Sequence, residues 1–324
     1  MRLPGLEEIR AAQEIVYRHM RPTPQYSWPL LNQRLDAEAW IKHENHTPAG
    51  SFKIRGPLIY LEWLCRSRPG LRGVIAATRG NHGQGVALAA KAFGLKASVV
   101  VPLGNSSEKN RAMRAQGAEL IEYGRDFQAS LEHAREFAAG EGLALIESFH
   151  ERLVMGTATY AMELFEGAPE LEAVYVPIGL GSSICGMAAA RNALGRKTKI
   201  VGVVAAESPS YARSFEQRRV VEAPAQTEIA DGLACRIPNR DALEIILAEV
   251  ERVMEVAEDE IRRAMRTYYE DTHNLAEGAG AAALAGALRD REVLRGRRIG
   301  AILTGSNVDR EVYAAVLNAE RGTD

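Results

Sequence analysis

Short apolar segments rich in β-branched residues alternate along the chain with longer, alanine-rich amphipathic segments. An uninterrupted apolar run of about four to eight residues is typical of a strand that is buried on both faces. Alternation of such strands with helices indicates parallel sheets that carry helices on both sides. The sequence therefore predicts an α/β protein built on two open, doubly wound sheets.

The same pattern predicts where the elements lie. The apolar runs predict strands at residues 73–77, 96–101, 118–123, 143–146, 173–178, 199–205 and 298–303. The amphipathic runs predict helices at residues 84–93, 109–116, 127–140 and 184–194. We expect a small domain formed by residues 67–150 and a large one formed by residues 1–66 and 151–324. Only about twenty residues follow Gly305, so we expect no regulatory extension and no feedback control by an end product.

Composition narrows the class of protein. The 324 residues carry a formal net charge of -2, which gives no electrostatic case for nucleic acid or an anionic membrane as a partner. The chain has three scattered cysteines, too few for a disulfide framework or a zinc site. The N-terminal segment lacks an apolar signal core, and no run of about 18 apolar residues occurs. We therefore expect a soluble cytoplasmic protein.

One segment places a lysine in unusual surroundings. Lys53 lies between Phe52 and Ile54 at the start of a predicted helix. Burial disfavours the ammonium form and lowers the pKa of an amine. A neutral amine can form a Schiff base with an aldehyde. The alternative is a surface lysine whose head reaches the solvent from a helix start.

Two glycine-rich loops each follow a predicted strand and precede a predicted helix. They are residues 77–85 (ATRGNHGQG) and residues 176–186 (VPIGLGSSICG). Glycines let the backbone approach a ligand, and the amides of a helix N-terminus can hold an anion such as phosphate. The alternative for the first loop is a tight turn with Asn81 as the N-cap. The second loop is only loosely similar to a dinucleotide-binding fingerprint.

Taken in this order, the segments resemble the threonine dehydratase and serine racemase family. These are fold-type-II, tryptophan synthase beta-like enzymes that use pyridoxal 5′-phosphate (PLP). The most specific pieces are residues 51–56 (SFKIRG) and 80–85 (GNHGQG). The resemblance covers almost the whole chain and extends to residues 21–24 (RPTP), 178–186 (IGLGSSICG), 231–234 (DGLA), 277–282 (EGAGAA) and 303–307 (LTGSN). It implies that the large domain binds PLP.

The resemblance also implies a role for each motif. Lys53 would bind the cofactor covalently and act as the base at the substrate Cα. Phe52 would pack beside the cofactor ring, and Asn81 would hydrogen-bond its phenolic oxygen. Thr304 would face the pyridine nitrogen, and Glu277 would lie near the cofactor edge as a substrate-binding residue. The phosphate would be held by backbone amides of Gly179, Leu180, Gly181, Ser182 and Ser183. The substrate carboxylate would be received by Thr78, Arg79, Gly80 and His82.

Several positions depart from the family pattern. Arg79 stands where racemases have the serine that acts as a base, and a guanidinium is a poor base, so we expect no racemisation. Arg79 could instead bind a substrate group or point to solvent. Where some members bind a divalent cation, Glu207 is followed by Arg213 in place of an acid, so we expect these two to pair and no metal ion to bind. Leu180 and Ser182 replace glycines, so Leu180 needs an ordinary backbone conformation or carries strain.

We therefore expect a PLP-dependent dehydratase, an ammonia-lyase that converts a β-hydroxy amino acid to a 2-oxo acid and ammonia by β-elimination. L-Threonine, and also L-serine, are the expected substrates. Phenylserine and threo-3-hydroxyaspartate are the alternatives that Arg79 keeps open. A β-replacement synthase and a non-catalytic PLP-binding protein are more distant alternatives. The family resemblance also implies a homodimer.

Overall fold

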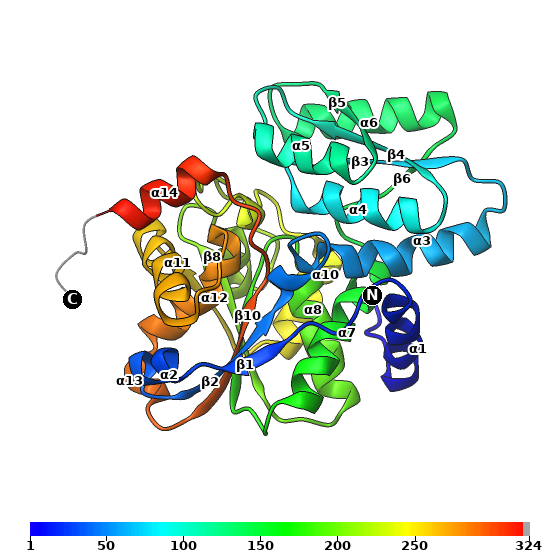
Figure 1. The fold of residues 1–324 in the computed structure, drawn as a ribbon. Helices are drawn as coiled ribbons and strands as arrows, with labels where there is room; N and C mark the ends of the chain where they lie inside the picture. Colours follow the sequence, from blue (N-terminus) through cyan, green and yellow to red (C-terminus); the bar gives the residue numbers. More distant parts are fainter. Residues whose placement is uncertain (320–324) are drawn as a thin grey trace. The chain divides into compact units, whose positions relative to one another are not determined.

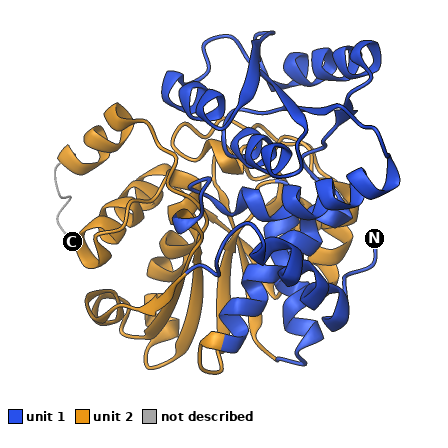
Figure 2. Ribbon diagram, turned by 45° about the vertical axis from the view of Figure 1, so that its right-hand side comes forward, with its two compact units in different colours: residues 1–23, 46–166, 180–196 blue, residues 24–45, 167–179, 197–324 orange. Residues whose placement is uncertain are grey.

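The structure is a computed structural model that describes residues 1–319. The chain divides into two compact units, which are coloured separately in Figure 2. Unit 1 comprises residues 1–23, 46–166 and 180–196, and unit 2 comprises residues 24–45, 167–179 and 197–324. Unit 1 thus contains the expected small domain of residues 67–150 together with chain segments on either side. The domain boundaries at residues 67 and 150 stay a prediction.

Unit 1 contains a parallel sheet of four strands in the order β5-β4-β3-β6. Its strands are β3 (Gly73–Ala77), β4 (Lys96–Val101), β5 (Ala118–Glu122) and β6 (Ala144–Leu145). Successive side chains of β3 enter different cores, because the side chains of a strand alternate between the two faces of a sheet. Val74 and Ala76 belong to the core that includes α4 (Asn81–Ala92), whereas Ile75 and Ala77 belong to the core that includes α6 (Phe127–Glu141). Both faces of this sheet are therefore covered, with α4 and α6 on opposite sides (Figure 1).

The helices of unit 1 begin where the sequence supplies capping groups. The Asp126 side chain accepts a hydrogen bond from the Ala129 amide at the start of α6, and Ser106 accepts one from Lys109 at the start of α5. Helix α6 ends at Gly142, whose φ of 66° is a left-handed conformation that costs glycine little. The remaining helices of this unit are α1 (Leu6–Tyr17), α3 (Arg55–Ser67), α5 (Ser107–Ala115), α7 (Glu151–Gly167) and α8 (Ser182–Ala193), with the 3-10 turn η2 (Phe52–Ile54) before α3 and the turn η1 (Glu44–His46) at the boundary with unit 2.

Unit 2 contains a sheet of six strands in the order β1-β2-β10-β7-β8-β9. All neighbouring pairs are parallel except β1 with β2. The strands are β1 (Gln25–Ser27), β2 (Glu38–His43), β7 (Ala173–Pro177), β8 (Lys199–Ala205), β9 (Arg252–Val256) and β10 (Arg298–Leu303). The helices are α2 (Pro29–Leu35), α9 (Ser210–Gln217), α10 (Arg240–Glu249), α11 (Glu258–Thr272), α12 (Gly278–Arg289), α13 (Arg291–Leu294) and α14 (Arg310–Asn318), with the 3-10 turn η3 (Asp231–Leu233).

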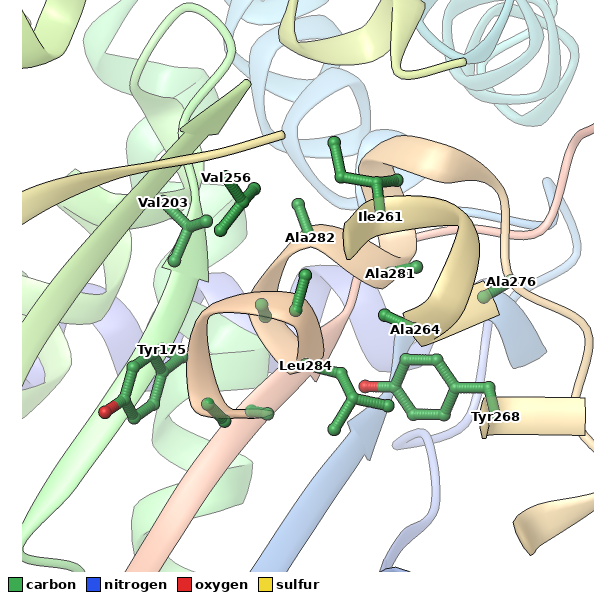
Figure 3. Close-up of a cluster of buried hydrophobic side chains, with 14 of the residues drawn as sticks. Tyr175, Val203, Val256, Ile261, Ala264, Tyr268, Ala276, Ala281, Ala282 and Leu284 are labelled. Atoms are coloured by element: carbon green, nitrogen blue, oxygen red, sulfur yellow. The ribbon is translucent and has the colours of Figure 1, made fainter. Parts of the chain in front are cut away.

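The core of unit 2 depends on small residues in α12, whose sequence is GAGAAALAGALR. Nearly all of this helix is buried, and it packs between the sheet and α11. Figure 3 shows Ala281, Ala282 and Leu284 of α12 among side chains of α11 and of the strands. A Cβ added at Gly286 would come within 3.0 Å of Val203. The glycines and alanines therefore let the helix approach the sheet closely, which fixes the position of its N-terminus.

The predicted α/β class with two open sheets is confirmed. The predicted strands at 73–77, 96–101, 199–205 and 298–303 match the observed bounds, and the others differ by one residue at one end or at both. Strands β1, β2 and β9 are additional to the prediction. The last five of the residues that follow Gly305, residues 320–324, lie outside the described residues. Within residues 1–319, no helix is both long and apolar enough to cross a membrane.

Candidate active site

Lys53 lies in the turn η2, directly before α3. Its Nζ atom is 5.0 Å from the centroid of the Phe52 ring. Helix α4 packs against this turn, and a Cβ added at Gly85 would lie 2.2 Å from the carbonyl oxygen of Lys53. Only a glycine allows two backbones to approach this closely. The lysine is therefore held beside the first turns of α4.

The residue pair that anchors this turn lies almost entirely inside the unit. Arg55 has no exposed surface and forms a two-point ion pair with Glu163 of α7, with nitrogen–oxygen distances of 2.6 and 3.0 Å. The same guanidinium donates to the hydroxyl oxygens of Thr159 and Thr23. A buried charge is stable only when its hydrogen-bonding groups are satisfied in this way. The pair fixes the start of α3, and with it the adjacent turn that carries Lys53.

The loop before α4 brings the expected substrate-binding residues together. Thr78 is buried, and its Oγ1 accepts a hydrogen bond from the Gly80 amide at 3.0 Å. Asn81 is the first residue of α4 and does not cap it, because the N-cap position belongs to Gly80. The Arg79 side chain is exposed and makes no hydrogen bond or ion pair with any described residue. The Lys109 side chain lies over Gly80, with its Cδ 3.0 Å from the position of an added Cβ.

His82 is buried in the first turn of α4. Burial, followed by the charge of Lys53, lowers the pKa of this imidazole to about 3, although a hydrogen bond with the backbone of Ile146 acts in the opposite direction. The ring is therefore neutral at pH 7. Its Nε2 atom has no hydrogen-bond partner among the described residues. A neutral imidazole next to Lys53 adds no positive charge to this part of the site.

The start of α8 forms the expected phosphate loop of unit 1. Gly181 has a φ of 103°, a conformation that L side chains rarely adopt, whereas Leu180 does not have a positive φ. The backbone of Leu180 is therefore unstrained. The Ser182 carbonyl accepts a hydrogen bond from Thr157 Oγ1 at 2.7 Å, and Ser183 Oγ lies 2.6 Å from the Tyr160 hydroxyl. The first amides of a helix have no acceptor within it, so this turn presents donors to an anion.

Two of the expected site residues of unit 2 follow strands, and a third begins helix α12. A Cβ at Gly179, after β7, would lie 2.4 Å from the Gly232 carbonyl oxygen. Thr304 follows β10, is buried, and donates to the Ala279 carbonyl oxygen at 3.4 Å. Glu277 is the buried N-cap residue of α12, and its amide donates to Gly305. Thr304 and Glu277 are therefore held near each other, at the junction of β10 and α12.

The expected pairing of Glu207 with Arg213 is wrong. The Arg213 side chain is exposed, and neither residue forms an ion pair within the described part of the chain. Glu207 has one buried carboxylate oxygen, Oε2, without a partner among the described residues. Arg213 lies within α9, where its helical position turns the side chain to the exposed face. Residues 1–319 contain no group of three or more His, Cys, Asp or Glu side chains that could hold a metal ion.

Comparison with known proteins places this arrangement in a family. Residues 16–305 match the family described as pyridoxal-phosphate dependent enzyme. The chain belongs to this family. One relative is L-threonine ammonia-lyase of Thermotoga maritima, 31% identical over 97% of this chain and 78% of the relative. Another is L-threo-3-hydroxyaspartate ammonia-lyase of Saccharomyces cerevisiae, 31% identical over 99% of this chain and 98% of the relative.

Solved structures show the same fold. The processed form of threonine deaminase isoform 2 from Solanum lycopersicum has a TM-score of 0.90 and 29% identity, covering 98% of this enzyme and 96% of that chain. Maize serine racemase also has a TM-score of 0.90, with 27% identity and 96% coverage of each chain. The enzyme is thus a PLP-dependent protein of the fold that the sequence predicted.

The residues of unit 1 fit PLP, which carries an aldehyde and a phosphate. Lys53 supplies an amine beside an aromatic ring, and the first turn of α8 supplies amide and hydroxyl donors. Three features of this arrangement were not foreseen from the sequence. Tyr160, the Arg55–Glu163 pair and the close approach at Gly85 all depend on partners from another element. Arg55 lies within the SFKIRG motif, so the sequence drew attention to this residue. Nothing in the sequence indicated its partner Glu163, Tyr160 or the contact at Gly85.

Proposed function

We propose that the enzyme is an ammonia-lyase that converts a β-hydroxy amino acid, L-threonine and also L-serine, to a 2-oxo acid and ammonia. The observation that carries the proposal is the close packing of the Lys53 backbone against α4 at Gly85. It holds the lysine beside the loop that begins at Thr78. Relatives along nearly the whole chain bear the names of ammonia-lyases, which supports this class of reaction.

Each residue takes the role that the family resemblance gives it. Lys53 would bind the cofactor aldehyde covalently, Phe52 would pack beside the ring, and Asn81 would hydrogen-bond the phenolic oxygen. Thr304 would offer a neutral hydroxyl to the pyridine nitrogen, and Glu277 would lie near the cofactor edge. The phosphate would be held by backbone amides of Gly179, Leu180, Gly181, Ser182 and Ser183. The substrate carboxylate would be received by Thr78, Arg79, Gly80 and His82.

The reaction divides between cofactor and protein. When bound, PLP disperses the negative charge that develops at the substrate Cα. Lys53 Nζ takes the proton from Cα, and the amides at the start of α4 hold the carboxylate so that this proton faces the lysine. The β-hydroxyl leaves as water, and the proton taken from Cα balances the proton that the hydroxyl gains. The released enamine moves a proton from its nitrogen to Cβ and becomes a 2-imino acid. Water then adds to the imine carbon, and the nitrogen leaves as ammonia. The net products are a 2-oxo acid and ammonia.

The test is the release of 2-oxo acid by the PLP-loaded enzyme from L-threonine, L-serine, L-threo-3-hydroxyaspartate and phenylserine. Lys53→Ala should abolish release and the visible absorbance of the cofactor–lysine adduct. Lys96→Ala, at an exposed lysine of β4, is the matched control and should retain both. No 2-oxo acid from any of the four substrates, with cofactor bound, would rule out the dehydratase and direct attention to β-replacement.

Arg79 favours a second candidate, the dehydration of an acidic substrate. Its guanidinium is exposed and makes no ion pair with a described residue. A guanidinium at the loop that receives the substrate α-carboxylate can also bind a second carboxylate on the substrate side chain. In this case Arg79→Gln should raise the KM for L-threo-3-hydroxyaspartate and leave the KM for L-threonine unchanged. An equal change for both substrates would exclude this candidate.

We also propose that the enzyme is a homodimer of the cytoplasm. The resemblance of the motifs to the threonine dehydratase and serine racemase family supports the dimer. None of the three cysteines is in a disulfide, as in proteins of a reducing compartment. Sedimentation velocity would give the assembly state, and a monomer at micromolar concentration would contradict the dimer.

A further inference from the structure

The hydroxyl of Tyr160 lies against the first turn of α8. It is 2.6 Å from Ser183 Oγ and 3.4 Å from the carbonyl oxygen of the same residue. Tyr160 has no exposed surface, and Ser183 is 5% exposed. The two residues belong to different helices, α7 and α8, and are 23 positions apart in the chain. A side chain buried far from the cofactor lysine in sequence therefore reaches the turn that presents donors to the phosphate.

The ring of Tyr160 is fixed from two sides. The Phe52 ring meets it edge-on at 6.2 Å between centroids, and the Arg55 guanidinium carbon is 5.8 Å from its centroid. Arg55 is in turn held by Glu163, one helical turn along α7 from Tyr160. These contacts leave the ring little freedom to rotate away, so the direction of its hydroxyl toward Ser183 is set by the packing. The same ring also links the turn of Lys53 to the start of α8.

The two hydroxyl hydrogens of Tyr160 and Ser183 determine whether Ser183 can donate a hydrogen bond to a phosphate. Each hydroxyl has one hydrogen to donate and can accept others. A phosphate dianion only accepts, so Ser183 can bond to it only by donating its own hydrogen. In that arrangement the hydrogen between the two oxygens must come from Tyr160. A chain of hydrogen bonds that all run in one direction strengthens each member, and most of all the bond to the charged group.

We propose that Tyr160 is a positioning residue that makes the Ser183 hydroxyl a hydrogen-bond donor to the cofactor phosphate. This inference rests on the proposed role of the α8 turn in holding that phosphate. It adds a residue outside the glycine loop, and outside every motif of the sequence, to the determinants of cofactor affinity. Thr157, one turn earlier in α7, contacts the same turn of α8, since its hydroxyl donates to the carbonyl oxygen of Ser182 at 2.7 Å.

The test compares PLP with pyridoxal, which lacks the phosphate. Dissociation constants are measured on the apoenzyme by quenching of tryptophan fluorescence. Tyr160→Phe keeps the ring and removes the hydroxyl. We expect it to raise the Kd for PLP about tenfold, which corresponds to about 1.4 kcal/mol, and to leave the Kd for pyridoxal within about twofold. In a Ser183→Ala background the same change should have no further effect on PLP, because the acceptor of the Tyr160 hydroxyl is gone.

A matched control is available in unit 2. Tyr268 is fully buried, and its hydroxyl has no hydrogen-bond partner among the described residues. Tyr268→Phe should therefore leave both dissociation constants unchanged. A purely structural role for Tyr160 would weaken PLP and pyridoxal equally, or would add to the effect of Ser183→Ala, and either result would overturn the proposal.

Two outcomes separate this inference from the proposed function. If the wild-type apoenzyme binds PLP with the absorbance of a lysine adduct but Tyr160→Phe binds it equally well, the inference is wrong and the function stands. If Tyr160→Phe does not fold, Ser183→Ala decides the matter. A Ser183→Ala enzyme that keeps the wild-type preference for PLP over pyridoxal overturns the inference, and a lost preference supports it. A wild-type protein that binds no PLP refutes both proposals.

Discussion

Replacement of Gly85 by alanine tests how closely Lys53 is held. The added Cβ would lie 2.2 Å from the Lys53 carbonyl oxygen and 2.6 Å from its carbonyl carbon, whereas an ordinary contact begins near 3.4 Å. The helix or the lysine turn must therefore move by about 1 Å, because both atoms at the contact belong to the backbone. A misplacement of about 1 Å at a reacting group can cost about a hundredfold in rate. Overpacking costs about 1–3 kcal/mol of stability, which the better helix propensity of alanine offsets by roughly 0.5–1 kcal/mol.

We expect kcat for 2-oxo acid release to fall about a hundredfold in Gly85→Ala, while the free energy of unfolding falls by no more than about 2 kcal/mol. Stopped assays of 2-oxo acid and urea titrations measure the two quantities. Gly140→Ala is the matched control, because nothing lies within 4 Å of its added Cβ in helix α6. It should keep the wild-type rate and gain slight stability. Wild-type kcat in Gly85→Ala would refute the argument that this contact positions the lysine.

Three further predictions concern buried charge, pH and metal. Glu163→Gln leaves the enclosed Arg55 without a counter-charge and should lower the free energy of unfolding by about 3–5 kcal/mol in urea titrations; a loss below about 1 kcal/mol would show that the pair is replaceable. Burial lowers the pKa of His82 to about 3, so between about pH 6.5 and that value the unfolded chain binds more protons than the folded one. Stability should therefore decrease as the pH falls through this range, and less so in His82→Asn; equal pH dependence of the two proteins in urea titrations would contradict this. Because Arg213 replaces an acid near Glu207, chelation with EDTA should change neither the melting temperature nor the rate, and one bound divalent ion per chain in elemental analysis would show the prediction to be wrong.

The parts of the fold that sequence could predict are those with continuous apolar runs. Strands β3, β4, β8 and β10 lie inside their sheets, and their runs stand out because both faces are buried. Strand β9 was not predicted, because it is an edge strand and its five residues include Arg252 and Glu255. Strand β2 (EAWIKH) places Lys42 within a sheet, and the Gln25 side chain accepts a hydrogen bond from that lysine. Such pairings arise between different elements of the chain, so local patterns do not reveal them.

The same distinction holds for the site. The glycine loops were recognisable because their composition is unusual within a few consecutive residues. Tyr160 had no such signal, because an aromatic residue in an amphipathic helix is typical of a core position. The role that we propose for Tyr160 depends on its contact with Ser183, and this contact exists only because α7 packs against α8. Glu207 and Arg213 are an example in which the sequence predicted a contact that does not form. Their spacing suggested an ion pair, but the Arg213 side chain is exposed and does not reach Glu207.

Unit 1 is assembled from three separate stretches of the chain, and this order affects how the protein is made on the ribosome. Lys53 and Arg55 emerge early, but the carboxylate that neutralises Arg55 is synthesised 108 residues later, and Ser183 later still. A nascent chain that ends before α8 therefore contains the lysine without the turn that we propose to bind the phosphate. Unit 1 includes residues 180–196, so it is complete only after these residues are synthesised. If the proposal holds, PLP can bind stably only to chains whose synthesis has passed α8.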